Sequence, residues 1–234
     1  MSNIAENIKK IRERMNQAAI RSGRDPGQIA LCAATKMNDA AAVRAAIAGG
    51  VDCCGENRVQ ELTEKAKENA YAGRPVHFIG HLQTNKVRQV VGKVDLIQSV
   101  DRLPLLECLQ REAARQGIRQ GILLEVNIGG EESKSGFAPS EVQAVAAGMK
   151  DYPALFLCGL MTIPPVSQAP GENIRFFEEM ANLFVDISRK KYDNVSMKQL
   201  SMGMSGDFED AIACGSTMIR VGTAIFGPRD YHSR

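Results

Sequence analysis

The sequence predicts an α/β fold, a single (β/α)8 TIM-type barrel, and two observations support this prediction. Eight short apolar segments alternate with segments of helical spacing, which is typical of repeated right-handed βαβ units. The length of 234 residues suits one such barrel, which needs roughly 250 residues. We therefore expect residues 1–234 to form one domain, with an extra N-terminal helix. An open doubly wound sheet is the alternative, but residues 35–38 lack the glycine fingerprint of its first turn.

The chain begins with a helix rather than a strand. Ile4, Ile8, Ile11 and Met15 recur at the spacing of one helical face, and charged residues occupy the other. These charges interrupt any apolar segment of the kind found in signal peptides, and no apolar run is long enough to cross a bilayer. We therefore expect a soluble cytoplasmic protein without a membrane association.

The first half of the chain supplies four strand and helix pairs. The segment of residues 29–36 reads IALCAATK, and its small and apolar residues after Pro26 and Gly27 are typical of a buried parallel strand. The helix that follows spans residues 39–48. Further strands, each with its helix, are expected at 51–55 with 59–71, 76–80 with 84–91, and 96–100 with 103–117.

The second half repeats the pattern, with a longer polar interruption. The fifth strand is expected over residues 121–128, and a polar, glycine-rich loop over 129–136 precedes a helix that starts at Pro139. The remaining strands are expected at 155–162, 197–202 and 218–222, with helices over about 176–187 and 206–214.

The overall composition excludes several classes of function. The 29 Lys and Arg residues nearly balance the 27 Asp and Glu residues, and no basic block indicates nucleic-acid binding. The six cysteines lie mostly within apolar runs, without a CxxC pair or clustered histidines that would indicate zinc. They are expected to be buried free thiols, and the scattered charges favour a monomer.

Lys36 ends the first expected strand and is the first candidate site residue. Strand alternation places it on the same face as Cys32 and Ala34, whose small side chains leave room for the lysine stem. A partly desolvated amine there could lose its proton and attack a carbonyl to form a Schiff base. The alternative is that Lys36 is simply the first solvated residue of a loop.

Two small-residue turns follow the seventh and eighth strands, where barrels often bind phosphate. Ser205 is expected to cap the following helix and face an anion, with Asp207 pointing away. Gly222 allows a ligand to approach the backbone, and Thr223 adds an amide and a hydroxyl. Either turn alone could be an ordinary cap, but both together favour a phosphate site.

Arg220 lies two residues before Gly222, so both should point into the barrel mouth. One interpretation is a structural salt bridge with Glu125 or Glu56. The other is a guanidinium that donates to the nitrogen of a pyridine ring. A phosphorylated heteroaromatic aldehyde, pyridoxal 5'-phosphate (PLP), would satisfy the lysine, the turns and the arginine together.

Other polar or sulfur-bearing residues are expected on the same rim because they end strands: Asn57, His81, Met161, Thr162 and Ser201. Seven segments then form a specific ordered set: ATK at 34–36, GENRVQE at 55–61, HFIGHLQTNK at 77–86, SKSG at 133–136, GLMT at 159–162, SMGMS at 201–205 and RVGTAIFG at 220–227. With these segments the chain resembles the pyridoxal phosphate homeostasis proteins, single-domain relatives of the alanine racemase N-terminal barrel. The resemblance covers nearly the whole length.

The resemblance implies a role for each matched residue. Lys36 would carry PLP as a Schiff base, Ser205, Gly222 and Thr223 would bind its phosphate, and Arg220 would lie at the ring nitrogen. Asn57 matches a residue near the cofactor in such proteins. Met161 and Ser201 complete the expected cofactor-binding set.

The resemblance also implies that PLP is buffered or delivered to apo-enzymes without catalytic turnover. Racemisation needs an acid or base on each face of the α-carbon, and in alanine racemases the second is a tyrosine from another domain. Tyr71, Tyr152, Tyr192 and Tyr231 lie away from the expected strand ends. A weak PLP-dependent amino-acid racemase, with His81 as candidate base, and a Schiff-base aldolase are the alternatives. Lys134, in the loop after the fifth strand, is expected to be solvent-exposed.

Overall fold

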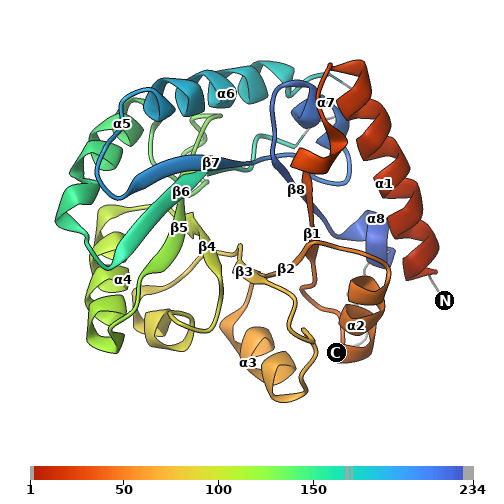
Figure 1. Ribbon diagram of the computed structural model, residues 1–234, viewed down its shortest axis with the longest axis horizontal. Helices are drawn as coiled ribbons and strands as arrows, with labels where there is room; N and C mark the ends of the chain where they lie inside the picture. The colour runs from red at the N-terminus through yellow and green to blue at the C-terminus, as the bar shows by residue number, and fades with distance from the viewer. Residues whose placement is uncertain (1–2, 167–168, 170, 229–234) are drawn as a thin grey trace.

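The computed structural model describes residues 3–166, 169 and 171–228. In this part of the chain eight parallel strands close into a barrel in sequence order, and β8 pairs back onto β1 (Figure 1). The expected barrel is therefore confirmed, and the open sheet is excluded. The strands are β1 Ala30–Ala34, β2 Cys53–Glu56, β3 Val76–Phe78, β4 Leu96–Val100, β5 Gln120–Val126, β6 Leu155–Thr162, β7 Val195–Ser201 and β8 Met218–Val221.

Helices surround the ring of strands on its outside (Figure 1). The α-helices are α1 Ile4–Arg21, α2 Ala40–Ala48, α3 Val59–Lys67, α4 Leu103–Gln116, α5 Pro139–Ala147, α6 Ile174–Ser188, α7 Phe208–Ala213 and α8 Thr223–Phe226. Short 3-10 helices are η1 Pro26–Gln28, η2 Thr84–Gln89 and η3 Gly148–Asp151. Among the described residues, none of these helices has the length and apolarity required to cross a bilayer.

The extra N-terminal helix, α1, completes the outer ring of helices beside the short helix α8. α8 is a single short turn, and α1 lies beside α7, α8 and α2 (Figure 1). Ile8, Ile11 and Met15 are buried in a cluster with the outward-facing Leu31 of β1 and Ile219 of β8. α1 therefore covers the outer face of β1 and β8, which would otherwise expose apolar side chains.

Several expected boundaries are wrong. Residues 84–91 do not form an α-helix, because the structure has only the 3-10 helix η2 there. β2 begins at Cys53 rather than residue 51, and β7 begins at Val195 rather than residue 197. β3 ends before Gly80, where the chain crosses so close to Asn57 that an added Cβ would lie 2.2 Å from its carbonyl oxygen.

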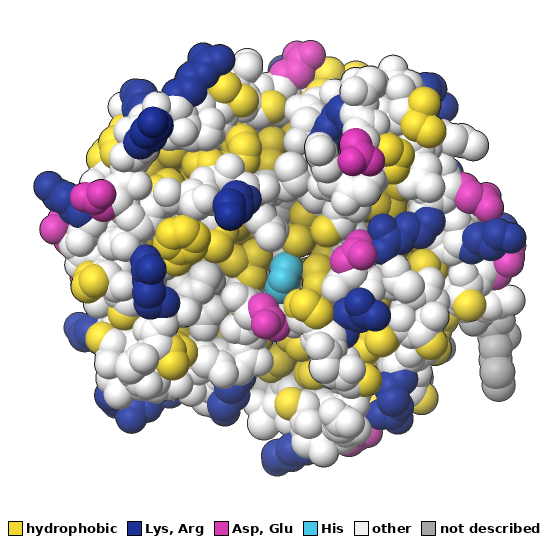
Figure 2. All heavy atoms as spheres, in the orientation of Figure 1, with side chains coloured by type: hydrophobic (Ala, Val, Ile, Leu, Met, Phe, Trp, Pro, Cys, Tyr) yellow, Lys and Arg dark blue, Asp and Glu magenta, His cyan; other side chains and the backbone are white. Residues whose placement is uncertain are grey.

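The two faces of the barrel wall differ in chemistry. Outward-facing residues form the large apolar cores against the helices. The interior contains two small apolar clusters, one around Cys32, Cys53 and Met218 and the other around Leu96, Leu123 and Met161. Buried Gln98 and Arg220 lie in the interior as well, so it also contains polar side chains. In the view of Figure 2, hydrophobic side chains and a histidine gather around the centre of the ring, while most charged residues lie over the outer elements.

Candidate functional site

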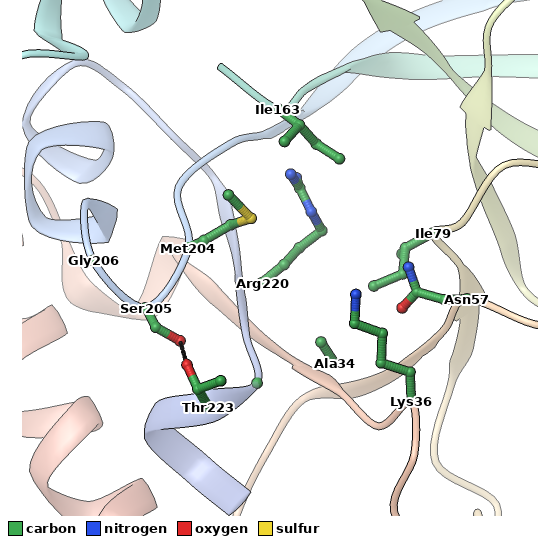
Figure 3. A pocket seen from close by; sticks show the side chains of 11 residues that line it. Ala34, Lys36, Asn57, Ile79, Ile163, Met204, Ser205, Gly206, Arg220 and Thr223 are labelled. Atoms are coloured by element: carbon green, nitrogen blue, oxygen red, sulfur yellow. Dashed lines mark hydrogen bonds between the residues drawn. The ribbon is translucent and has the colours of Figure 1, made fainter. Parts of the chain in front are cut away.

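A cavity of about 290 Å³ opens at the rim where the strands end. It is lined by residues that follow or end six different strands, so it exists only because the barrel closes (Figure 3). The lining residues are Ala34, Lys36, Asn57, Ile79, Ile163, Met204, Ser205, Gly206, Arg220, Gly222 and Thr223. Lys36, from near the start of the chain, thus lies in one cavity with Ser205, Gly222 and Thr223 from near its end.

Lys36 is half-buried, and its amine points into the cavity beside the Asn57 side chain (Figure 3). The predicted alternation holds, since Cys32 is inside the barrel, Ala34 lines the cavity wall, and Lys36 continues on the same face. Met37 has a left-handed backbone (φ 62°), and its amide donates to Oε2 of Glu61 at 2.7 Å. The backbone that carries Lys36 is therefore fixed on its C-terminal side.

A buried ion-pair network holds the other side of that backbone from outside the barrel. The amine of Lys65 donates to the carbonyl oxygen of Thr35 at 2.8 Å and pairs with Oε1 of Glu56 at 2.8 Å. The hydroxyls of Thr35 and Tyr71 also donate to this carboxylate. Burial raises the pKa of Glu56 despite its pairing with Lys65. Lys65 and Glu56 thus anchor the strand end that presents Lys36, a role that the sequence did not reveal.

The turns after β7 and β8 meet at their hydroxyl groups. Oγ1 of Thr223 donates to Oγ of Ser205 at 3.2 Å (Figure 3), and the amide of Ala224 donates to the same oxygen at 3.4 Å. Amides at the start of a helix lack acceptors within it, which makes this end of α8 suited to an anion. The side of the cavity formed by Ser205, Gly206, Gly222 and Thr223 is called the hydroxyl turn below.

The expectation that Ser205 caps the helix after β7 is wrong. Asp207 occupies the N-cap position of α7, and Oδ1 of Asp207 accepts from the amide of Met204 at 2.7 Å. Its Oδ2 accepts from Nδ2 of Asn173 at 2.9 Å. The carboxylate therefore braces its own loop and does not line the cavity, which leaves the hydroxyl of Ser205 in the turn.

Arg220 forms the wall of the cavity opposite the hydroxyls and is almost fully buried. Its Nη1 donates to Oγ of Ser201 at 2.7 Å, and its Nη2 donates to the carbonyl oxygen of Thr162 at 2.8 Å. Among the described residues no carboxylate forms an ion pair with Arg220, and Glu56 is paired with Lys65 instead. Of the two interpretations of Arg220, the structural salt bridge is therefore excluded for Glu56 and not formed with Glu125.

Glu125, at the end of β5, still affects the charge balance near this arginine. Burial raises the pKa of the Glu125 carboxyl to about 7, and Asp101 shifts it in the same direction, while Arg220 opposes the shift. Near neutral pH this carboxyl is therefore only partly ionised. It does not line the cavity.

Met161 and Ser201 lie one layer deeper than expected. Met161 is fully buried against Leu96 and Leu123 inside the barrel. Ile163, two residues later and on the same side of the chain, is the residue that lines the cavity. Ser201 lies beneath Arg220, where its hydroxyl accepts from the guanidinium and donates to Oε1 of Gln98 at 2.7 Å. Ser201 thus positions Arg220 rather than lining the cavity.

His81 and Lys134 also lie outside the cavity lining. Nδ1 of His81 lies 3.0 Å from Oδ2 of Asp101 and 3.4 Å from the hydroxyl of Ser135, which fits a role in holding the loop. Lys134 is half-buried rather than fully solvated, donating to the carbonyl oxygen of Pro164 at 3.0 Å and pairing with Glu131. Of the four tyrosines, Tyr231 lies outside the described residues, and the others do not line the cavity.

One buried atom tests whether this cavity fits a pyridoxal cofactor. Oδ1 of Asn57 is buried and has no hydrogen-bond partner, which is costly unless a ligand supplies a donor. In PLP the aldehyde and a ring hydroxyl are neighbours, as Lys36 and Asn57 are in the cavity (Figure 3). Ile79, Ile163 and Met204 supply apolar surface for a ring, a contribution that the motifs did not indicate. The residues present therefore fit the cofactor.

Comparisons with known proteins agree with this geometry. Residues 1–230 match the family described as alanine racemase, N-terminal domain. The chain is 41% identical to the pyridoxal phosphate homeostasis protein of Pseudomonas aeruginosa, with 99% of this chain and 98% of that protein covered. It is 40% identical to the protein of the same description in Escherichia coli, with both chains fully covered. The structure of PipY from Synechococcus elongatus with PLP bound is similar at 32% identity and a TM-score of 0.81, covering 96% of this chain and 100% of that chain.

Proposed function

Because this chain belongs to the pyridoxal phosphate homeostasis proteins, which are built on the alanine racemase N-terminal domain, we propose that it binds PLP in the rim cavity and buffers or delivers it. The whole chain, residues 1–234, would act as one PLP-binding barrel domain. The observation that carries the proposal is that a lysine amine, a buried arginine and a hydroxyl turn line one small cavity.

Each side of the cavity has a role in this proposal. When bound, PLP supplies an aldehyde that condenses with a primary amine, and Lys36 presents its amine to the cavity. Ser205, Gly222 and Thr223 would receive the phosphate, since the hydroxyls of Ser205 and Thr223, the backbone of Gly222 and the start of α8 form one turn. Asn57 would accept a hydrogen bond from the ring hydroxyl.

Arg220 would face the ring nitrogen and set the electronic character of the cofactor. Its guanidinium stays charged, so it can donate to that nitrogen but cannot give it a proton. A pyridine nitrogen without its own proton is a weaker electron sink, which disfavours carbanion chemistry. This favours a carrier over a catalyst.

The surroundings of the cavity support a carrier for a second reason. Among the described lining residues, Lys36 and Arg220 are the ionisable ones, and neither His81 nor a tyrosine stands opposite Lys36. The hydroxyl of Tyr71 is engaged with Glu56 behind the strand. We propose that the recipients are apo-enzymes that use PLP, and that the protein acts in the reducing cytoplasm, as its six free cysteines suggest.

Weak racemase activity is the second candidate, and the match of residues 1–230 to the alanine racemase N-terminal domain is the observation that favours it. Racemisation requires exchange of the α-proton with solvent. We expect L-alanine incubated in deuterium oxide with the PLP-loaded protein to retain its α-proton. Exchange that disappears in Lys36→Ala would instead establish the racemase.

The absorption spectrum of the purified protein tests the proposed function. We expect the PLP-loaded protein to show visible absorption that survives gel filtration, and Lys36→Ala to lose it. Lys134→Ala is the matched control, because its amine binds Pro164 and Glu131 outside the cavity, and it should retain the absorption. Loss of absorption in Lys134→Ala with retention in Lys36→Ala would refute the assignment.

A further inference from the structure

Three metal-binding side chains meet inside the barrel, outside the set of residues that line the cavity. Cys32 of β1, Cys53 of β2 and His77 of β3 are buried, and their ligand atoms all lie within 4.8 Å of one another. Cys32 and Cys53 are directly paired in the β1–β2 register, and Sγ of Cys53 lies 3.6 Å from Nδ1 of His77. These three residues are called the interior triad below.

The interior triad offers soft ligands. Thiolate sulfur and imidazole nitrogen are the donors that Zn²⁺ and related d10 ions prefer, whereas Mg²⁺ and Ca²⁺ prefer oxygen. Met218 of β8 belongs to the same buried cluster and adds a thioether sulfur. We propose that the interior triad binds one thiophilic d10 cation, of which Zn²⁺ is the reference ion.

The charges and protons of this step balance. Two thiols would each lose a proton to solvent, two metal–sulfur bonds would form, and neutral His77 would give its lone pair. A divalent cation with two thiolates carries no net charge, so the bound ion would add no net charge to the barrel interior. Neither an oxidant nor a reductant is required.

Gln98 supplies the surrounding hydrogen bonds. Its Nε2 lies 2.8 Å from Nδ1 of His77 and donates to the sulfur of Met218 at 3.2 Å. A metal bound at Nδ1 would replace the contact with His77, and the amide would keep its hydrogen bond to the sulfur of Met218. Second-shell donors of this kind orient metal ligands.

The interior triad lies near the end of the barrel opposite the cavity. Cys53 is the first residue of β2, and Ala30, the first residue of β1, is half-buried in the same cluster. Cys53 and His77 retain 3% and 6% exposure, so small openings of the strand ends would admit an ion. The sequence indicated no zinc site because the three ligands come from three strands and share no local spacing motif.

Titration of the reduced, metal-free protein with Cd²⁺ tests the proposal, because thiolate–Cd²⁺ bonds absorb in the ultraviolet. We expect one Cd²⁺ per chain, release of two protons per ion, displacement by Zn²⁺ and no competition from Mg²⁺. Cys32→Ala and Cys53→Ala should each lose the absorption. Cys108→Ala and Cys214→Ala are the matched controls, because both thiols are only partly buried and outside the interior triad, and they should retain it.

Circular dichroism of each variant shows whether it is folded. If Cys53→Ala does not fold, Cys32→Ala and the proton count on the wild-type chain still decide the question. Absorption that persists in a folded Cys32→Ala or Cys53→Ala would overturn the site. So would a reduced wild-type protein that binds no Cd²⁺ or releases no protons.

Discussion

Arg220 is held inside the barrel mouth by two neutral oxygens rather than by a carboxylate. The hydroxyl of Ser201 and the carbonyl oxygen of Thr162 accept its hydrogen bonds, and the guanidinium is almost fully buried. These neutral acceptors do not form an ion pair with the guanidinium, so a ligand atom that accepts a hydrogen bond is favoured in front of it. Alternation along β8 predicts the direction of Arg220, but only the closed barrel brings Ser201 beneath it.

Replacement of Ser201 by alanine should destabilise the protein and weaken PLP binding. It removes an acceptor from a buried charged donor and a donor from Gln98, so we expect the free energy of unfolding to fall by about 1.5–3 kcal/mol. Urea denaturation and PLP titration measure the two effects. Ser196→Ala, on the same strand but half-buried, should change both only slightly. Unchanged stability in Ser201→Ala would contradict the positioning role.

Glu125 makes stability fall as pH rises through the weakly acidic range. Its pKa is raised from 4.5 to about 7 in the folded protein, so between these values the folded state binds more protons than the unfolded state. The contribution of this group is therefore present below pH 4.5 and lost as pH rises through 7, by up to about 3 kcal/mol. Buried His77, whose pKa is lowered to about 4, acts in the opposite direction, so the decrease is measured as the difference between the wild-type chain and Glu125→Gln in urea denaturation of the cofactor-free protein at pH 5 and pH 8.

Glu125→Gln should remove most of that pH dependence, because the amide does not titrate. Glu107→Gln is the control, because Glu107 is an exposed residue of α4. It should keep the wild-type dependence of stability on pH. A wild-type protein that is more stable at pH 8 than at pH 5, with Glu125→Gln behaving identically, would show that Glu125 ionises normally.

At the scale of elements, the apolar periodicity predicts which segments form strands and helices, and local backbone contacts decide where they end. The helical spacing of Ile8, Ile11 and Met15 is enough to predict α1 and its buried face. The early end of β3 cannot be predicted in this way, because it depends on the crossing of Gly80 and Asn57. The helix cap at Asp207 was missed for a similar reason, since its partners come from Met204 and from distant Asn173.

α1 should contribute directly to the stability of the barrel. Ile11 lies on the buried face of α1, and its side chain is only 2% exposed. We therefore expect Ile11→Ala to lower the free energy of unfolding by about 2–4 kcal/mol. Ile20→Ala, on the same helix at 67% exposure, should change it by less than about 0.5 kcal/mol. Equal effects of the two substitutions in denaturant melts would mean that α1 does not cover β1 and β8.

The turn after β7 requires glycine at Gly203. This residue has φ +93°, and an added Cβ would lie 2.6 Å from Cβ of Ala211 and 3.0 Å from Cα of Phe208. Gly203→Ala should therefore displace the hydroxyl turn, lower the unfolding free energy by about 2 kcal/mol or more, and weaken PLP binding. Gly148→Ala, where an added Cβ meets nothing within 4 Å, should preserve both. If Gly203→Ala bound PLP with wild-type affinity, the turn after β7 would not bind the phosphate.

At the scale of the whole molecule, closure of the barrel creates both the cavity and the interior triad. The count of eight strands predicts the closed ring and hence the meeting of Lys36 with Ser205 and Thr223. The depth of each side chain below the rim could not be predicted, because it depends on strand register and bulges. Met161 and Ser201 are therefore one layer lower than their motifs suggest, and Cys32, Cys53 and His77 come together without a sequence signature.

Borohydride reduction of the PLP-loaded protein, followed by peptide mapping, tests the central claim most directly. Reduction makes the bond between the aldehyde carbon and a lysine amine permanent, so the labelled peptide identifies the binding residue. We predict one pyridoxyl group per chain, on the peptide that contains Lys36, and none in Lys36→Ala. A label on Lys134, Lys65 or any other lysine, with Lys36 unmodified, would contradict the assignment of the rim cavity as the PLP site.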